Sequence, residues 1–358
     1  MEKVNHKMIE IARMSRGLTQ KDLASLIPSI NQPNLSKVEK GELNVTSETI
    51  NNIASALSYP VGFFFKEELK TPFSNIYFRK RSVIPQKKLD KIFADIKIIL
   101  TSIDLLLADI DLAEYPRYSF DLTDGWTPES VAIRMREILK IPSGPVKDIV
   151  TKIENTGIII YFYDSPDDKF DGLTAYTNDG HPVIFVNKNM PNDRIKFTIV
   201  HEFGHLVMHI PCNVEPWREF ELETNKFTSE FFMPKKECYH DLRTVSFNRL
   251  GILKTYWGIS KAAIIRRAKD VDAIPESTYK YLMIELGRKN ERKNETGYVE
   301  IDEPKILNMV IDLLKTELGQ SKDEIAESLQ LGVNDYCKIF DDNDGNIKPK
   351  LRFMKSAV

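Results

Sequence analysis

The pentapeptide His201-Glu202-Phe203-Gly204-His205 contains residue types that can bind a metal ion and accept a proton. On a helix the two histidines, at positions i and i+4, project from one face and can bind one cation. Glu202 lies one residue along, where it can reach a water molecule at that cation without being a ligand. Zinc suits such a site because it accepts imidazole and carboxylate ligands and can keep one position open. We therefore predict that the two histidines bind zinc.

The next predicted helix carries candidates for a third ligand. Its segment ELETN (residues 221–225) contains two carboxylates, and one of them could complete a site of two histidines and one glutamate. Asn225 could orient a ligand through a hydrogen bond. His209 would lie about 80° round the helix from His201, and the glycine-bearing spacing of metzincins is absent, so we do not expect it to be a ligand. The competing interpretation is a pair of structural histidines without a metal.

A helix that packs against a hydrophobic core must hold the two histidines in place. We predict one long helix in DRIKFTIVHEFGHLVMHI, with Asn192 as its N-cap and Pro211 at its end. A second helix is expected over about residues 218–232. The apolar side chains that would press the first helix against a core are Phe197, Ile199, Val200, Leu206 and Val207.

A small sheet is predicted upstream of the histidines. Thr127 caps a helix over residues 129–139, and the segment IIIYFY after Gly157 has the composition of a strand. LTAYT and PVIFVN form a hairpin, because Asn178-Asp179-Gly180 between them supplies the positive φ angles of a tight turn. These elements predict an α+β domain over residues 126–245.

Residues 1–67 have the spacing of four short helices. The second is expected over residues 20–27 and the third over residues 32–40. Polar caps and glycines mark the helix ends: Gly17, Thr19 with Asp22, Asn31, Gly41, and Thr46 or Ser47.

The composition is that of a folded protein with more than one domain. At 358 residues the chain exceeds the size at which one hydrophobic core stops growing. A hydrophobic content of 42% and a charged content of 28% exclude global disorder. The net charge is -2, so nucleic-acid binding would need a local basic surface. Cys212, Cys238 and Cys337 are widely separated, which predicts a reduced chain in the cytoplasm.

We expect neither a signal peptide nor a membrane span. The most apolar stretch, residues 96–112, is interrupted by aspartates and is predicted to be an amphipathic helix. It belongs to a connecting region, residues 68–125. A basic run in this region could add phosphate contacts and consists of Arg79, Lys80, Arg81, Lys87 and Lys88. Residues 246–358 are predicted to be mostly helical.

The segment HEFGHLVMH, followed by ELETNKFTSEFFMP, resembles the signature of the ImmA/IrrE family of metallopeptidases. The resemblance spans roughly residues 127–270. Its register implies Glu221 as the third ligand, in preference to Glu223 and Glu219. The chain departs from the family pattern at positions that we expect to be packing positions: Thr224 and Thr228, where alanine is usual, and Phe231-Phe232, where two leucines are usual.

This resemblance implies zinc-dependent hydrolysis of peptide bonds. Zinc polarises the scissile carbonyl and activates water, while Glu202 accepts the proton as general base and passes it to the leaving amine. A further side chain should stabilise the transition state from across the site. The candidates are Tyr176, His181 and His240.

The segment LTQKDLASLIPSINQPNLSKVEKGE resembles the helix-turn-helix of the Cro/phage-repressor-like (XRE) family, over about residues 5–66. The resemblance implies that the third helix enters the major groove of DNA. The residues expected to contact DNA are Gln20, Gln32, Asn34, Ser36 and Lys37. The residues expected in the core are Leu23, Ala24, Leu35 and Val38.

Two further expectations concern this domain. Arg13 and Glu39 should form an ion pair inside it. The turn LIPSIN is about one residue longer than usual and lacks the customary glycine. The alternative is therefore a repressor-like domain that binds protein instead of DNA.

Together these features predict a multidomain, mainly α-helical protein. The expected domains are a helix-turn-helix bundle (1–67), a basic and amphipathic connector (68–125), a zincin-like α+β metallopeptidase domain (126–245) and a helical C-terminal region (246–358). We expect a zinc-dependent endopeptidase coupled to a domain that binds double-stranded operator DNA, cleaving a transcriptional repressor or related regulator in stress or mobile-element control. A homodimer is compatible with this organisation, and no membrane partner is expected. The alternative is a transcription regulator or antitoxin-like binding protein whose zinc domain is a sensor or scaffold without turnover.

Overall fold

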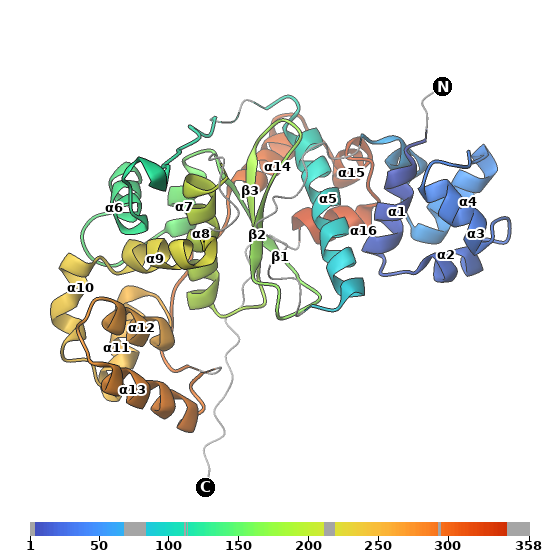
Figure 1. Ribbon diagram of the computed structural model, residues 1–358. Helices are drawn as coiled ribbons and strands as arrows, with labels where there is room; N and C mark the ends of the chain where they lie inside the picture. Colours follow the sequence, from blue (N-terminus) through green and yellow to red (C-terminus); the bar gives the residue numbers. More distant parts are fainter. Residues whose placement is uncertain are drawn as a thin grey trace, which may run out of the picture.

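The computed structural model describes residues 4–67, 84–110, 112, 114–210, 219–292 and 295–341. Over these residues the chain is mainly helical and contains one small sheet (Figure 1). Several residues on which expectations were placed lie outside the described part of the chain: Arg79, Lys80, Arg81, Pro211, Cys212 and residue 218, where a helix was expected to begin.

The N-terminal domain is a bundle of four helices followed by a 3-10 turn. Its elements are α1 (His6–Ser15), α2 (Gln20–Leu26), α3 (Gln32–Glu39), α4 (Ser47–Leu57) and η1 (Val61–Phe65). The side chains of Thr19, Asn31 and Thr46 cap α2, α3 and α4, each accepting a hydrogen bond from the backbone N–H three residues on. Of the four residues expected in the core, Leu23, Leu35 and Val38 are buried and Ala24 is half-buried.

One long helix, α5 (Gln86–Leu107), connects this bundle to the rest of the molecule. It packs against α1 on one side and against the sheet on the other (Figure 1). The hydroxyl of Tyr163, at the end of a strand, donates to Asp95 Oδ2 on α5 at 2.8 Å. The amphipathic helix predicted from the apolar stretch is therefore a bridge between two cores, and it begins earlier in the chain than residue 96.

The sheet has three strands: β1 (Ile159–Tyr163), β2 (Gly172–Tyr176) and β3 (Pro182–Asn187). Their order is β1-β3-β2, with β2 and β3 forming the predicted antiparallel hairpin and β1 parallel to β3. Side chains alternate between two layers, as they must in a strand. Ile160 and Ile184 lie in the core on one face, while Ile159 and Phe185 lie in the core on the other face, with α5.

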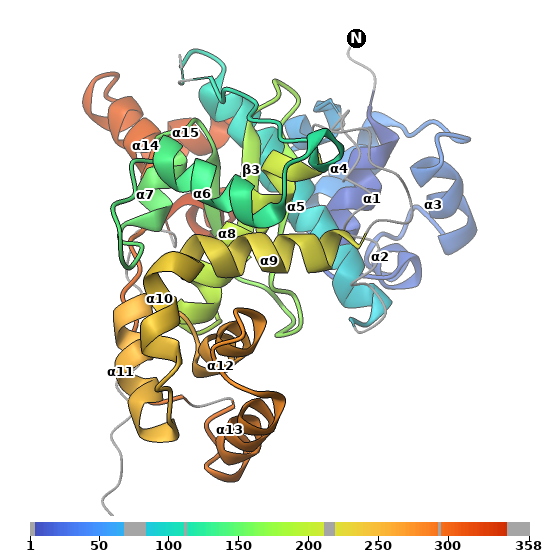
Figure 2. The same ribbon diagram turned by 60° about the vertical axis from the view of Figure 1, so that its left-hand side comes forward.

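Helices α6 (Pro128–Ile138), α7 (Ile149–Glu154), α8 (Asn192–Met208) and α9 (Phe220–Phe232) complete the α+β domain. α8 lies on the face of the sheet opposite α5, and α9 packs across α6 and α8 (Figures 1 and 2). The prediction that Asn192 caps α8 is wrong. Pro191 is the N-cap, and Asn192 Nδ2 instead donates to the carbonyl of Val299 at 2.9 Å, so it ties a later segment to the helix.

The helices after α9 divide between two places. The first four form one group in which α12 packs against α11 and α13: α10 (Lys235–Leu242), α11 (Phe247–Trp257), α12 (Lys261–Asp270) and α13 (Glu276–Arg288) (Figure 2). On the other side of the molecule, near α5 and the N-terminal bundle, lie α14 (Ile306–Thr316), α15 (Lys322–Ser328), α16 (Val333–Tyr336) and the turn η4 (Cys337–Asp341) (Figure 1). A short turn, η3 (Leu122–Asp124), precedes α6.

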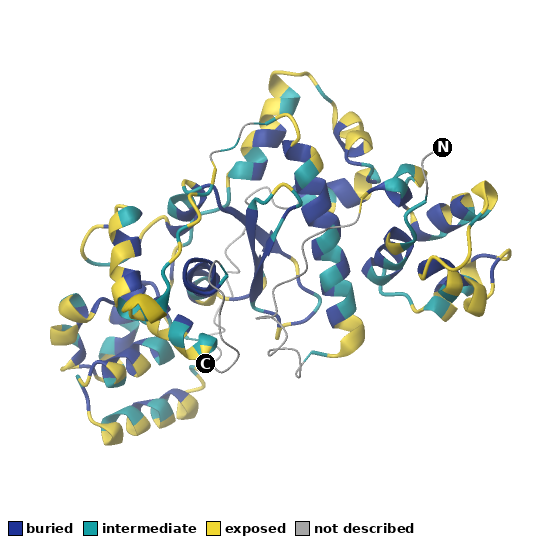
Figure 3. Cartoon of the chain, turned by 45° about the horizontal axis from the view of Figure 1, so that its top comes forward, coloured by how far each residue is buried: buried dark blue, intermediate teal, exposed yellow. Residues whose placement is uncertain are grey.

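Two hydrophobic cores therefore meet at the sheet, which is buried on both faces (Figure 3). One core joins the N-terminal bundle, α5 and the helices from α14 onward. The other joins α6 to α13. Within the parts of the chain that the structure describes, no helix is both long and apolar enough to cross a membrane.

Candidate functional site

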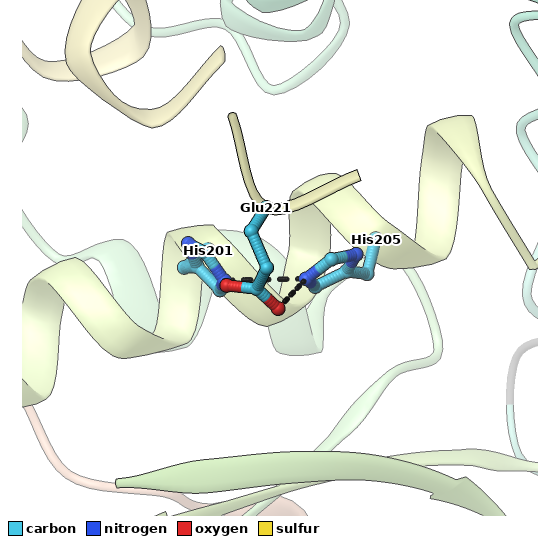
Figure 4. A group of neighbouring side chains, drawn as sticks. All are labelled: His201, His205 and Glu221. Atoms are coloured by element: carbon cyan, nitrogen blue, oxygen red, sulfur yellow. Dashed lines mark hydrogen bonds and ion pairs between the residues drawn. The ribbon is translucent and has the colours of Figure 1, made fainter. Parts of the chain in front are cut away.

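His201 and His205 on α8 and Glu221 on α9 converge on one point (Figure 4). The Nε2 atoms of the two histidines are 3.2 Å apart. Glu221 Oε2 lies 3.3 Å from His201 Nε2, and its Oε1 lies 3.5 Å from His205 Nε2. Both imidazoles are buried, whereas the side chain of Glu221 is 40% exposed. The site is thus a buried pair of nitrogens closed by a carboxylate that solvent can reach.

The chemistry and spacing of these three donors fit zinc. Zinc binds imidazole nitrogen and carboxylate oxygen at about 2.0–2.2 Å, usually in a tetrahedron. The edge of such a tetrahedron is about 1.6 times the bond length, so two ligand atoms lie roughly 3.3–3.6 Å apart. The three observed separations run from 3.2 to 3.5 Å. The side chains already lie at about the separation that one zinc ion would require.

Gly204, within the pentapeptide, allows α9 to approach α8 closely enough to deliver Glu221. A Cβ at position 204 would lie 2.8 Å from Phe227 Cδ1 and 3.0 Å from Thr224 Cγ2, both on α9. The first contact is shorter than real Cβ contacts and the second is tighter than nine in ten of them, so a larger residue would force these side chains or the helices that carry them to shift. Sequence reasoning treated this glycine as part of the motif and missed its packing role.

Glu202 lies on the side of α8 that faces the sheet. It is 2% exposed, and its Oε2 accepts a hydrogen bond from the hydroxyl of Thr174 on β2 at 3.3 Å. It does not belong to the group of three donors. Its carboxylate therefore lies between α8 and β2.

The other nitrogen of His205 faces a second group of polar side chains. Its Nδ1 lies 3.0 Å from His209 Nδ1 and 3.3 Å from Thr224 Oγ1. Nε2 of His209 in turn lies 2.9 Å from Glu223 Oε2. His209 is outside the group of three donors, but it contacts one of them, His205.

Two expectations about the surroundings of the ligands are wrong. Asn225 is exposed and, among the described residues, makes no hydrogen bond to a ligand, so it does not orient one. Thr224, expected to be only a packing position, has its hydroxyl beside His205. Both errors arise because the rotation of α9 about its own axis decides which side chains face α8, and that rotation depends on tertiary packing.

The three candidates for a transition-state donor are spread over different elements. Tyr176 ends β2, two residues from Thr174 and so on the same face of the strand, and burial raises the pKa of its hydroxyl. His181 lies in the hairpin turn, and His240 is exposed on α10. Within the described chain, no hydrogen bond links any of the three to His201, His205 or Glu221.

The residues expected to read DNA lie on and beside α3, which sits at the outer end of the molecule (Figure 1). Gln32, Asn34 and Lys37 are exposed, and Ser36 is half-buried. Gln32 Nε2 donates to Gln20 Oε1 at 3.0 Å, which fixes the orientation of both amides.

A buried ion pair lies behind the exposed side chains of α3. Arg13 donates to both carboxylate oxygens of Glu39 at 2.6 and 2.9 Å, as predicted, and Gln20 Nε2 donates to the same carboxylate at 2.7 Å. In the longer turn between α2 and α3, the buried side chains of Ile27 and Ile30 anchor the backbone to the core. The turn therefore packs without the customary glycine.

A hollow of about 750 Å³ opens between α1, α2 and the start of α5. Gln20, Lys21 and Gln32 line it from the N-terminal bundle, and Lys87 lines it from α5. The described end of the basic run thus lies beside the surface expected to face DNA.

Two family models match parts of this chain. The model of the IrrE N-terminal-like domain matches residues 154–269, and a helix-turn-helix model matches residues 9–64. No curated protein and no solved structure matches the chain. The first match contains the three converging donors and extends through α11 into α12, and the second contains α2 and α3. The chain therefore combines an N-terminal XRE-type helix-turn-helix domain with a peptidase-family domain of the IrrE/ImmA kind.

Proposed function

We propose that this protein is a zinc-dependent endopeptidase coupled to a DNA-binding domain. The observation that carries the proposal is the spacing of His201, His205 and Glu221, which agrees with the ligand spacing of tetrahedral zinc. A buried glutamate beside them supplies the proton acceptor that hydrolysis needs.

Bound zinc would polarise the scissile carbonyl and make a water molecule more acidic. Glu202 would accept a proton from that water and deliver it to the leaving amine. The hydrogen bond from Thr174 would hold the Glu202 carboxylate in one orientation during both transfers. His201, His205 and Glu221 would hold the ion, and their positions on two packed helices keep that geometry rigid.

The edge of the sheet offers a way to bind an extended peptide. Among the described strands, β2 pairs with β3 on one side only. A substrate strand could add to its other side through main-chain hydrogen bonds. Because Thr174 on β2 contacts Glu202, a peptide bound there would pass close to the proton acceptor.

The helix-turn-helix domain supports a regulatory target. We propose that it binds double-stranded operator DNA and that the substrate is a transcriptional repressor or related regulator, in stress or mobile-element control. Exposed amide and lysine side chains on α3 suit such binding, because amides pair with adenine and lysine contacts phosphate or guanine.

The test is cleavage of candidate repressors from the same genome, with fragments identified by mass spectrometry. The wild-type chain should produce fragments, whereas Glu202→Gln should not. Glu202→Gln should still hold about one zinc per chain by elemental analysis, because Glu202 is not a ligand. Cleavage by Glu202→Gln would eliminate it as the general base.

The metal itself is tested by a double variant, His201→Ala with His205→Ala, which should lose the zinc. Glu219→Gln is the matched control, since this exposed carboxylate lies at the start of α9 outside the donor group and should retain the metal. Stoichiometric zinc in the double variant would contradict the site. Zinc retention without cleavage of any candidate would favour the alternative of a sensor or scaffold without turnover.

A further inference from the structure

His205 must present a lone pair on Nε2 to bind zinc, so the single proton of its neutral ring must be on Nδ1. Which nitrogen carries the proton is decided by the hydrogen bond that the other nitrogen makes. Nδ1 of His205 faces two groups, Thr224 Oγ1 at 3.3 Å and His209 Nδ1 at 3.0 Å. The protonation of those two neighbours therefore determines the tautomer of His205.

Thr224 uses its only hydroxyl proton elsewhere. Its Oγ1 donates to the backbone carbonyl of Phe220, one turn earlier on α9, at 2.7 Å. A hydroxyl that donates in one direction can still accept through its oxygen lone pairs. Toward His205 Nδ1, Thr224 can therefore act only as an acceptor.

Glu223 determines which nitrogen of His209 carries the proton. Its Nε2 lies 2.9 Å from the carboxylate oxygen Oε2 of Glu223, and an ionised carboxylate can only accept. In the neutral ring Nε2 therefore carries the proton, which makes Nδ1 of His209 an acceptor. This is the atom that lies 3.0 Å from His205 Nδ1.

Both groups that face Nδ1 of His205 are therefore acceptors, and both favour a proton on that nitrogen. If His205 carried its proton on Nε2, its Nδ1 lone pair would face the lone pairs of both Thr224 and His209 across these short distances. On the opposite side of the ring, Nε2 of His205 lies 3.5 Å from Glu221 Oε1 and 3.2 Å from Nε2 of His201, so a proton on Nε2 would have one acceptor, His201, within hydrogen-bond distance. The Nδ1–H tautomer satisfies both groups that face Nδ1, whereas the Nε2–H tautomer gains one contact with His201 and leaves the lone pairs at Nδ1 opposed to those of Thr224 and His209.

We propose that Thr224 and the His209–Glu223 pair are positioning residues that hold His205 in the tautomer whose Nε2 lone pair is available to zinc. The inference rests on the proposed zinc site. It assigns a role to Thr224, which replaces the alanine usual in the resembling family and adds an acceptor to a metal ligand. It also explains why His209 is not a ligand, because its Nε2 contacts Glu223 and its Nδ1 contacts the nitrogen of His205 that faces away from the proposed zinc.

The experiment measures the tautomer and the zinc affinity separately, on the full chain at about pH 8, where an ordinary imidazole is neutral. Chains labelled with ¹⁵N in their six histidines report the protonated nitrogen of each ring by NMR, and His205→Ala identifies the signal of His205. Zinc affinity is measured by competition with a chelator. The variants are Thr224→Val, which removes only the hydroxyl, Thr224→Ser, which restores it, and Thr224→Val combined with His209→Phe.

In the metal-free wild type, His205 should be the Nδ1–H tautomer. The combined variant should populate the Nε2–H tautomer and bind zinc about 10–100-fold more weakly, as is typical when partners of a ligand are lost. Thr224→Val should have a smaller effect in the same direction, and Thr224→Ser should match the wild type. A purely structural role would not move the protonated nitrogen. Phenylalanine at 209 would retain the ring contact with Phe220, whose centroid lies 5.0 Å away.

The inference is overturned if the combined variant keeps the Nδ1–H tautomer, or if its zinc affinity stays within about threefold of the wild type, well below the expected loss. Failure of the proposed function looks different, because then the wild-type chain itself would bind no zinc. In that case the tautomer in the metal-free chains still decides whether these side chains hold His205 as stated. If the combined variant does not fold, Thr224→Val is compared with Thr224→Ser. The protonated nitrogen of His205 and the zinc affinity again decide the outcome.

Discussion

His201 and His205 lie 3.2 Å apart at their Nε2 atoms because four residues on a helix return to the same face. That part of the site depends on local geometry alone, so the sequence spacing was enough to predict it. Glu221 was selected over Glu223 only through the register of a family resemblance. The structure brings Glu221 to the histidines and sets Glu223 against His209 instead.

Thr224 and His209 could not be assigned in this way. Their contacts with His205 depend on how closely α9 approaches α8 and on how α9 is rotated, and neither follows from the spacing of residues within one helix. A usable signal did exist. Thr224 stands where the resembling family has alanine, on the helix that is expected to carry the third ligand. Its hydroxyl is a polar group that needs a hydrogen-bond partner once it is buried.

A buried carboxylate away from the metal centre should make stability depend on pH. Glu154, at the end of α7, accepts backbone hydrogen bonds from Lys305 and Ile306, and burial raises its pKa to about 7. Its folded pKa is therefore above the usual value of about 4.3, so the folded chain binds the proton more tightly. The stabilising effect is complete below about pH 4 and is lost as pH rises toward 7.

Glu154→Gln imitates the protonated carboxyl and should remove this dependence. Between about pH 5 and pH 8 the free energy of unfolding of the wild type should fall relative to the variant by up to roughly 3 kcal/mol. Urea unfolding at several pH values measures the difference, and comparison of the two chains cancels the titration of all other groups. Parallel curves for the two chains would show that the pKa of Glu154 is not raised.

At the scale of elements, the close approach of α8 and α9 depends on Gly204. Gly204→Ala should lower the free energy of unfolding by about 1–3 kcal/mol, because its Cβ would overlap with Phe227 and Thr224. By moving α9 away, the change should also weaken zinc binding through Glu221. Thermal unfolding and chelator competition measure the two effects.

Gly251 provides the matched control for this change. It lies within α11, and a Cβ there would meet no atom within 4 Å. Gly251→Ala should therefore be neutral or stabilise the chain by up to about 1 kcal/mol, as alanine does inside helices. Equal destabilisation by the two substitutions would mean that the packing of α8 on α9 is not tight at Gly204.

The elements of the N-terminal bundle were predictable because their signals are local. Thr19, Asn31 and Thr46 cap helices through contacts within one turn, so the sequence alone located the beginnings of three helices. Asn192 has a comparable local signal, but a proline precedes it and its side chain is used by a distant segment. Tertiary contacts override a local preference in that case.

The exposed face of α3 leads to a prediction about DNA. Residues on this face should bind a specific operator, and Gln32→Ala or Asn34→Ala should cost about 1–3 kcal/mol at one base position if an amide contact is lost. Lys37→Ala should weaken binding to all sequences and reduce the salt dependence by about one unit if Lys37 contacts phosphate. Selection from a random duplex library, followed by titration at several salt concentrations, provides both measurements.

Glu48→Ala on α4 is a control for these variants, since this exposed residue belongs to the same domain but not to α3. It should leave the selected operator sequence unchanged. If no sequence is enriched and Lys37→Ala leaves the residual binding untouched, the domain binds protein instead of DNA.

At the scale of the whole molecule, the last described helices pack against the N-terminal bundle. Residues from α14 onward share one core with the N-terminal bundle, α5 and one face of the sheet. The helical character of this region was predictable from its composition, but its location was not, because no local signal records a contact across more than three hundred residues. The contact between Arg16 and Asp335 is the clearest example.

This contact joins the N-terminal bundle to α16 through charge and shape. Arg16 Nη1 and Nη2 each donate to a carboxylate oxygen of Asp335 at 2.7 Å, and the guanidinium also lies 4.0 Å from the centre of the Tyr59 ring. Arg16 Nε donates to the carbonyl of Leu57 at 2.8 Å. Bidentate pairs of this kind are geometrically specific and stronger than single surface contacts.

Asp335→Ala should therefore loosen the attachment of α14, α15 and α16 to the bundle. The pair is partly exposed, so the expected loss is about 1–2 kcal/mol, between the values for surface and buried pairs. Hydrogen exchange should become faster both in α16 and around Leu57 and Tyr59, since both sides of the contact lose a partner. Asp312→Ala, which removes an exposed carboxylate from α14, should change neither exchange nor stability. If the two variants behave alike, the apolar contacts of the shared core hold these helices to the bundle. The ion pair between Arg16 and Asp335 then does not stabilise the attachment.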